Sequence, residues 1–196
     1  MNIKNKFILL SIAVSIMLTG QECKTQSASF HVVLSLQGIS FDVSTTGQGS
    51  IQKLSIQPAG LSIINRELNH EIDGRVVDAE IEDLNGDGYP ELLIYTQSAG
   101  SGSYGDVIAY SVNNGKSVSQ VYFPPLSENP GAMKGYMGHD ELTLIEASLS
   151  RRFPIYKKGD TNAQATGGMR QIQYTIVDGE ASRRFEIVKF TDYPPG

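Results

Sequence analysis

The chain has 196 residues, of which 40% are hydrophobic and 19% are charged. This composition is typical of an ordered globular protein and excludes a disordered or collagen-like chain. The 16 Lys and Arg residues are outnumbered by 21 Asp and Glu residues, which leaves a formal net charge of -5. Because binding to phosphates requires clustered cations, we expect no nucleic acid partner.

The first 20 residues have the pattern of a secretory signal. Lys4 and Lys6 precede an apolar run over 7–18, which ends in Thr19-Gly20. The run is about a dozen residues long, whereas a transmembrane helix needs about 20. We therefore expect a signal peptide over 1–20, a flexible tether over 21–29 and one β domain over 30–192. The mature protein is expected in the periplasm or outside the cell.

Cys23 is the one cysteine of the chain, so no internal disulfide can form. A cysteine just after a signal is often the lipid-attachment site of a bacterial lipoprotein, which would anchor this protein to the outer membrane. However, Glu22 stands where a small residue is usual. The alternative is a free thiol in the tether.

From residue 30 onward, apolar residues mostly alternate with polar ones or occur in short runs rich in β-branched and aromatic types. The predicted strands are 30–36, 39–44, 51–56, 75–81, 91–95, 107–112, 118–123, 141–147, 171–177 and 184–190. Asn113-Asn114-Gly115 and Asp178-Gly179-Glu180 predict hairpins, since these residue types tolerate positive φ. The predicted fold is all-β: a single antiparallel β-sandwich or open barrel.

The basic residues of the second half are expected to face water. They are Arg151, Arg152, Lys157, Lys158, Arg183 and Arg184. Between them, Phe153-Pro154 predicts an edge strand, because proline interrupts strand hydrogen bonding.

The segment DLNGDGYPE, residues 83–91, carries oxygen-bearing side chains at Asp83, Asn85, Asp87 and Glu91. Alternate residues of a tight loop can converge on a hard cation, so a calcium site is one interpretation. The flanking segments resemble strands and the twelfth position is Ile94, which excludes an EF-hand. The alternative is a strand-connecting turn in which Asp and Asn side chains accept hydrogen bonds from backbone N–H groups.

No constellation typical of an enzyme is present. His31, His70 and His139 occur in separate contexts, and none forms a zinc-protease motif. A serine hydrolase motif fails because position 102 would have to be serine. We expect a protein without catalytic activity and without a required cofactor.

The segment TQSAGSGSYGD, residues 96–106, is too rich in glycine and serine to be a core strand, so we expect a projecting loop. It lacks the lysine and the following helix of a phosphate-binding loop. Within it, Ser101-Gly102-Ser103-Tyr104 forms an S-G-x-Y element after the DLNGDGYPELL segment. Together with the stretches 138–146, 151–174 and 179–181, this order resembles the bacterial periplasmic inhibitors of I-type (invertebrate) lysozyme.

The resemblance implies an exported β-sandwich, commonly dimeric, that inserts the S-G-x-Y loop into the lysozyme cleft. Carried over, the lysozyme-binding residues are Ser101, Gly102, Ser103 and Tyr104, with Ser101 and Tyr104 as the binding pair. A second contact loop is placed at Thr166, Gly167 and Gly168. The partner implied is an I-type lysozyme. The alternative function is a calcium-binding β module that recognises glycan or cell-envelope material through Asp83 to Glu91.

Overall fold

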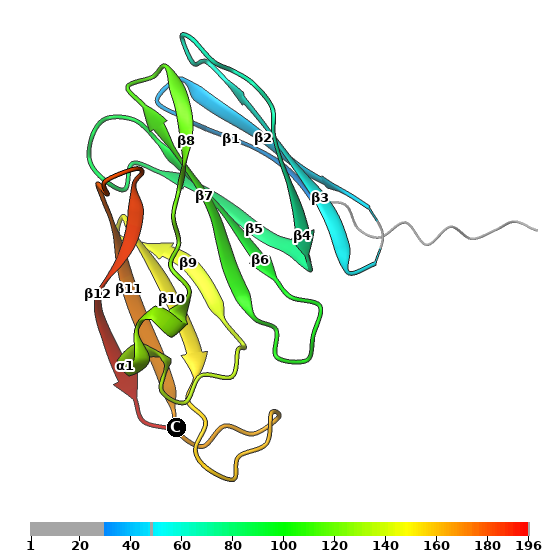
Figure 1. The fold of residues 1–196 in the computed structure, drawn as a ribbon, viewed down its shortest axis with the longest axis vertical. Helices are drawn as coiled ribbons and strands as arrows, with labels where there is room; N and C mark the ends of the chain where they lie inside the picture. Colours follow the sequence, from blue (N-terminus) through cyan, green and yellow to red (C-terminus); the bar gives the residue numbers. More distant parts are fainter. Residues whose placement is uncertain (1–29, 48, 196) are drawn as a thin grey trace, which may run out of the picture.

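The computed structural model describes residues 30–47 and 49–195. The predicted signal segment, the tether and Cys23 lie outside the described residues. Within them, twelve strands form three four-stranded antiparallel sheets (Figure 1). Among the described residues, no helix is long and apolar enough to cross a membrane.

Each sheet is built from four strands that are consecutive in the chain. Sheet A contains β1 (His31–Leu36), β2 (Ile39–Thr46), β3 (Ile51–Ala59) and β4 (Leu68–Asp73). Sheet B contains β5 (Arg75–Glu82), β6 (Glu91–Gln97), β7 (Gly105–Asn113) and β8 (Ser117–Val121). Sheet C contains β9 (Glu141–Ile145), β10 (Ser148–Pro154), β11 (Met169–Val177) and β12 (Arg184–Tyr193). The short helices η1 (Leu126–Glu128) and α1 (Pro130–Met133) connect sheet B to sheet C.

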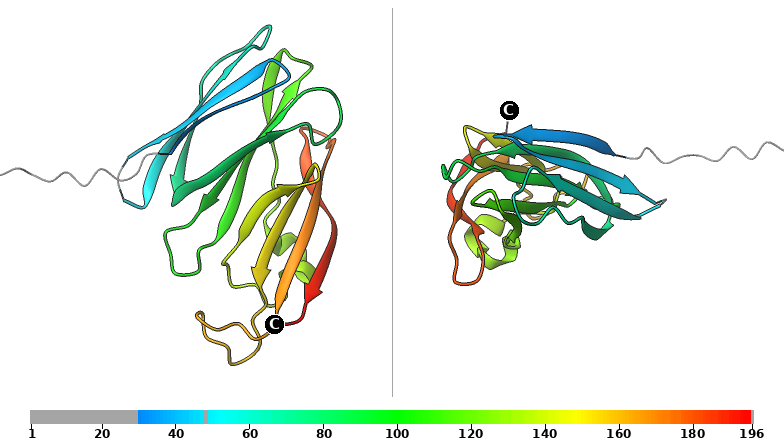
Figure 2. Two further views of the ribbon diagram at one scale, coloured as in Figure 1. Left: turned by 180° about the vertical axis from the view of Figure 1, so that it is seen from behind. Right: turned by 90° about the horizontal axis from the view of Figure 1, so that it is seen from above.

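Sheet B is the middle of three layers, as the two orientations in Figure 2 show. Leu92 and Ile94 of β6 belong to an apolar core shared with sheet A. Leu93 and Tyr95, which point the other way, belong to a second core shared with sheet C. Because both faces of β6 are covered, its apolar residues are continuous rather than alternating. The predicted all-β antiparallel fold is confirmed, and its sandwich has three layers and two cores.

The two predicted hairpins are confirmed. Strand β7 pairs with β8, and the turn between them places Asn114 and Gly115 at positive φ (49° and 66°). Strand β11 pairs with β12 over nearly their whole length.

The prediction of an edge strand at Phe153-Pro154 was wrong. Strand β10 lies between β9 and β11 in sheet C. Its pairing with β9 ends at Arg152, and Pro154 is the last residue of the strand. The proline therefore lies beyond the end of β9, where its missing N–H interrupts no bond to that strand.

Candidate functional site

Loop 98–104, which runs from Ser98 to Tyr104, connects the central strand β6 to β7. The Ser98 N–H donates to the Tyr104 carbonyl (2.9 Å), and the Tyr104 N–H donates to the Ser98 hydroxyl (3.0 Å). Farther out, the Ser103 N–H lies 3.0 Å from the Gly100 carbonyl oxygen. Backbone and side chain thus close the loop from within, although its tip contains no core residue.

The Tyr104 ring packs over the backbone of its own loop and remains 48% exposed. It meets the Tyr136 ring edge-on, with centroids 5.7 Å apart and an interplanar angle of 72°. A Cβ at Gly102 would overlap the Tyr104 ring, and one at Gly138 would lie 3.2 Å from it. Because Gly102 and Gly138 have no side chain, one edge of the Tyr104 ring packs against their backbone. The rest of the ring faces solvent.

The polar groups at the loop tip remain available. Ser101 is exposed, and among the described residues neither its hydroxyl nor the Tyr104 hydroxyl has a hydrogen-bond partner. A hydroxyl can donate one hydrogen bond and accept others. The loop therefore presents two unused hydroxyls and a broad aromatic surface outward.

A buried ion pair supports the end of the loop. The Arg151 Nε donates to Asp140 Oδ1 (2.7 Å), and the two side chains are 5% and 0% exposed. Asp140 Oδ2 accepts from the Gly105 N–H (2.8 Å) and from the Tyr136 hydroxyl (2.6 Å). Arg151 also donates to the Tyr136 hydroxyl oxygen (2.7 Å). The residue that follows Tyr104 is thereby tied to the core of sheet C.

The charges of this cluster are stable. Burial alone would lower the pKa of Arg151, but the hydrogen bond and the charge of Asp140 outweigh it and raise that pKa. Burial raises the pKa of Tyr136, and the Asp140 charge adds to the shift although the Arg151 charge opposes it. Arg151 therefore stays cationic and Tyr136 keeps its proton, which it donates to Asp140.

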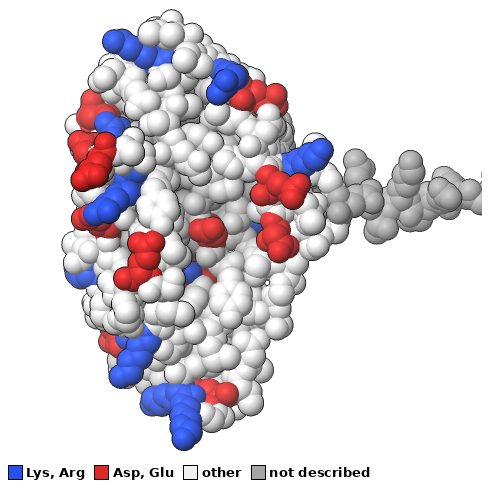
Figure 3. All heavy atoms as spheres, in the orientation of Figure 1, with Lys and Arg blue, Asp and Glu red and all other residues white. Residues whose placement is uncertain are grey.

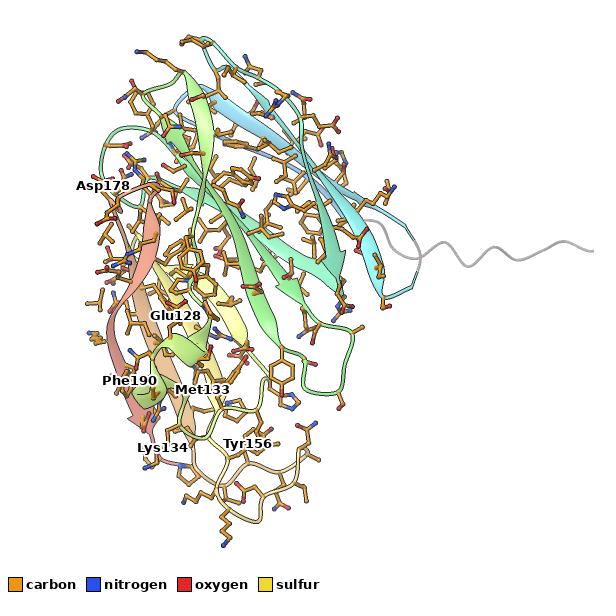
Figure 4. The ribbon with its side chains drawn as sticks, in the orientation of Figure 1. Glu128, Met133, Lys134, Tyr156, Asp178 and Phe190 are labelled. Carbon is orange, nitrogen blue, oxygen red and sulfur yellow. The ribbon has the colours of Figure 1, made fainter. Side chains whose placement is uncertain are left out.

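Loop 155–168 connects β10 to β11 at the same end of the molecule, at the bottom of Figure 1. Tyr156, labelled in Figure 4, lies at this end as well. Of this loop, Asn162 reaches loop 98–104: its Nδ2 donates to the Ser101 carbonyl oxygen (3.1 Å). Two segments far apart in the sequence are thus joined beside the S-G-x-Y element.

The predicted second contact loop lies at the base of loop 155–168. The Gly167 N–H donates to the Ile155 carbonyl (2.8 Å), and the Ile155 N–H donates to the Gly168 carbonyl (2.8 Å). A Cβ at Gly167 would overlap Ile155, and one at Gly168 would overlap the Tyr193 carbonyl. The two glycines therefore allow the backbone to pack closely where the beginning and the end of the loop meet. Thr166 is exposed, and its hydroxyl bonds to Asp160 (2.9 Å).

A groove of about 550 Å³ opens beside Tyr104. Its walls combine apolar side chains such as Phe123 and Met133 with the carboxylates of Glu71, Asp73 and Asp106. Figure 3 shows this face hollowed at its centre, with acidic side chains around the hollow. The groove next to loop 98–104 therefore carries three acidic side chains, and the one cation among the described residues that line it, Arg151, is paired with Asp140.

The comparison with protein families finds a match that includes this loop. Residues 64–123 match the family model of the periplasmic lysozyme inhibitor of I-type lysozyme. The resemblance that rests on the S-G-x-Y element is confirmed over these residues. No curated protein and no solved structure matches the chain.

The match to the inhibitor family runs from the end of sheet A through sheet B and includes loop 98–104 entirely. The description of that family is of a periplasmic inhibitor of I-type lysozyme. The match ends before the stretches 138–146, 151–174 and 179–181. Sheet C and loop 155–168, which hold the S-G-x-Y loop in place, lie outside it.

The acidic loop 83–91 also lies within the match to the inhibitor family. Asp83 accepts hydrogen bonds from three backbone N–H groups of the loop, those of Gly86, Asp87 and Gly88. Glu91 Oε1 accepts from the Asn85 Nδ2 (3.0 Å). These contacts are those of a strand-connecting turn. Across the described residues, no group of three or more His, Cys, Asp or Glu side chains is placed to hold a metal ion.

Arg183 supplies a positive charge to the same loop. Its guanidinium lies 2.8 Å from Asp87 Oδ2 and 3.5 Å from Glu91 Oε1. Burial raises the pKa of Glu91, although hydrogen bonds from Ser111 and from the Leu84 N–H oppose the shift. Arg183, in the turn of the β11–β12 hairpin, thus places one positive charge against two carboxylates of the acidic loop, and this geometry favours the turn interpretation.

Sequence reasoning missed the residues that hold the loop. The expectation that the basic residues face water was wrong for Arg151, which is 4% exposed, and for Arg183, whose side chain is 23% exposed. One signal for Arg151 was present: it alternates with Leu149 and Phe153, so all three lie on one face of a strand. An arginine between two apolar residues on a buried face requires a carboxylate partner.

Proposed function

We propose that this protein is an exported inhibitor of I-type lysozyme that inserts Ser101 to Tyr104 into the cleft of the enzyme. The observation that carries the proposal is the family match over loop 98–104, combined with the two unused hydroxyls at its tip. The role is blockade, so no catalytic residue is assigned to this chain.

The chemistry of the loop suits a glycosidase cleft. Such an enzyme typically works with two carboxyl groups, one protonated as the general acid and one ionised. The Ser101 hydroxyl can donate to a carboxylate or accept from a carboxylic acid. The exposed part of the Tyr104 ring would cover sugar-binding surface, and its hydroxyl offers one more hydrogen bond. Ser101 and Tyr104 together would occupy the positions that substrate needs.

The support below the loop lowers the cost of binding. A loop that must be ordered on association loses affinity through the entropy of its backbone and side chains. Here the internal hydrogen bonds, the Tyr136 contact and the bonds of Asp140 and Arg151 to Gly105 order the loop in the free protein. Binding energy from Ser101 and Tyr104 is therefore retained as affinity.

The charge of the protein favours encounter with a basic enzyme. The chain carries a net charge of -5, and the groove beside Tyr104 contains three carboxylates. Complementary charge mainly increases the association rate, and salt screens it. A homodimer and a lipid anchor at Cys23 remain predictions that accompany this proposal.

The test is a cell-wall lysis assay with purified I-type, C-type and G-type lysozymes, each titrated with the mature protein. We expect inhibition of the I-type enzyme and little or none of the other two. A soluble chitooligosaccharide that occupies the cleft should compete with the inhibitor in a binding assay. Full lysis by the I-type enzyme at a large molar excess of folded protein would contradict the proposal, as would binding that the oligosaccharide does not affect.

A further inference from the structure

Two consecutive carbonyl groups of the S-G-x-Y loop point inward. The Ser101 carbonyl oxygen accepts from Asn162 Nδ2 (3.1 Å), and the Gly102 carbonyl oxygen accepts from the His139 N–H (2.6 Å). Both donors come from segments outside the hairpin that carries the loop. The carbonyls of Ser101 and Gly102 are therefore satisfied within the protein, while the Ser101 side chain remains exposed.

The Asn162 side chain is held at both ends. Its Oδ1 lies 3.2 Å from His139 Nε2, which donates if that nitrogen carries the proton. The backbone carbonyl of Asn162 accepts from the Tyr156 hydroxyl (2.9 Å), and the Tyr156 ring stacks against the His139 ring with an interplanar angle of 30°. Asn162 is therefore a fixed amide that connects loop 98–104 to His139 and Tyr156.

The loop that carries Asn162 is itself closed. Asp160 accepts hydrogen bonds from the Lys157 N–H (2.7 Å) and from the Thr166 N–H (2.8 Å). These two bonds tie the two halves of loop 155–168 together on either side of Asn162. The position of the amide is thus set before any partner arrives.

We infer that Asn162 is a positioning residue for lysozyme inhibition, which sets the orientation of Ser101 by holding its carbonyl group. The inference rests on the proposed function and adds a residue outside the family match, in the loop that carries Thr166, Gly167 and Gly168. Loop 155–168 thus contributes to lysozyme inhibition through the hydrogen bond from Asn162 to loop 98–104. Removal of the amide leaves the Ser101 carbonyl without its donor and lets the tip move.

The test is a double-mutant cycle on the inhibition constant for I-type lysozyme. Asn162→Ala should weaken inhibition about tenfold, and the same change in a Ser101→Ala/Tyr104→Ala background should have less than about a twofold effect, since residues that act through one another are not additive. Gln164→Ala is the matched control, because it removes an exposed amide from the same loop, and it should leave inhibition unchanged.

A second variant distinguishes the two hydrogen bonds of the Asn162 side chain, one to His139 and one to Ser101. Asn162→Asp keeps an acceptor for His139 but loses the donor to Ser101, so it should behave as Asn162→Ala does. Amide exchange of Ser103, whose N–H closes the turn in the loop, should accelerate in both variants. Equal effects of Asn162→Ala in the two backgrounds, or wild-type inhibition by Asn162→Asp, would overturn the inference. In either case inhibition by the wild-type protein, measured in parallel, shows that the proposed function stands.

Discussion

Gly102 sets how the Tyr104 side chain is presented. The residue is buried directly beneath the ring, and its backbone lies outside the left-handed region, so sterics alone require glycine there. Gly100, two residues earlier, has no atom within 4 Å of the place where a Cβ would lie. An alanine methyl group would therefore overlap the Tyr104 ring at position 102 but would contact nothing at position 100.

Gly102→Ala should weaken lysozyme inhibition by about tenfold, or about 1.4 kcal/mol, because the new methyl group displaces the Tyr104 ring. Gly100→Ala should leave inhibition within about twofold, since it adds a methyl group in open space. Inhibition constants of the two variants against the wild type check this. Equal effects of the two substitutions would show that the ring position does not matter.

At the scale of single residues, the sequence predicted the exposed residues of the loop but not the buried residues that support it. Ser101 and Tyr104 are recognisable because the S-G-x-Y element is local. Asp140 and Arg151 are not, because their pairing depends on which strands become neighbours, and the polar segment around His139 resembles an ordinary surface turn. The physical reason is that burial of a charge is a property of tertiary packing, whereas a turn motif is a property of adjacent residues.

At the scale of elements, the buried ion pair of Asp140 and Arg151 connects the start of β9 and strand β10 to the end of loop 98–104. Asp140→Ala leaves the Arg151 charge buried without its carboxylate partner, which should lower the free energy of unfolding by about 3 to 5 kcal/mol. Asp42→Ala is the control: its contact with the His31 side chain is about half exposed, and its loss should cost about 0 to 1 kcal/mol. Chemical denaturation of both variants measures the difference. A cost below about 1 kcal/mol for Asp140→Ala would show that the pair does not stabilise the fold.

Loop 155–168 depends on the ionised form of Asp160. Hydrogen bonds from the Lys157 and Thr166 N–H groups hold the pKa of this carboxyl below its ordinary value of 3.8. A carboxyl with a lowered pKa in the folded state stabilises that state above its unfolded pKa, and the contribution is lost as the pH falls through the folded pKa. The loop should therefore keep its closed form from neutral pH down to about pH 4.

The amide signals of Lys157 and Thr166, followed by NMR during an acid titration, check this expectation. We expect a shared transition with a midpoint below 3.8, and no such transition in the Asp160→Asn variant. A midpoint at or above 3.8 would contradict the account of how this loop is held.

The whole molecule is organised around the middle sheet. Ten of the twelve strands were predictable, because alternation and β-branched residues mark a half-buried strand locally. Strand β4 was missed because it contains few apolar residues. Of β10, only the end at Phe153-Pro154 was predicted, as an edge strand, because Arg151 and Arg152 interrupt the apolar pattern before it. The three-layer arrangement was not predictable. The continuous apolar run of β6 does not show that one of its faces packs against sheet A and the other against sheet C.

Leu92 and Leu93 test the three-layer arrangement. Both are fully buried, although they point to opposite faces of β6. Replacement of either by alanine should lower the free energy of unfolding by about 2 to 5 kcal/mol. Val33→Ala, at a position 57% exposed, should change it by less than about 0.5 kcal/mol. A near-neutral effect at Leu92 or at Leu93 would show that one face of sheet B is uncovered.

The claim that the tip of loop 98–104 blocks the enzyme is tested most directly by the inhibition constant of the Ser101→Ala/Tyr104→Ala variant for I-type lysozyme. The double variant should fold as the wild type does, because both side chains are exposed at the loop tip. Its inhibition should be weaker by about 1 to 4 kcal/mol in total if the two residues are central to the interface. Unchanged inhibition by a folded double variant would contradict the account.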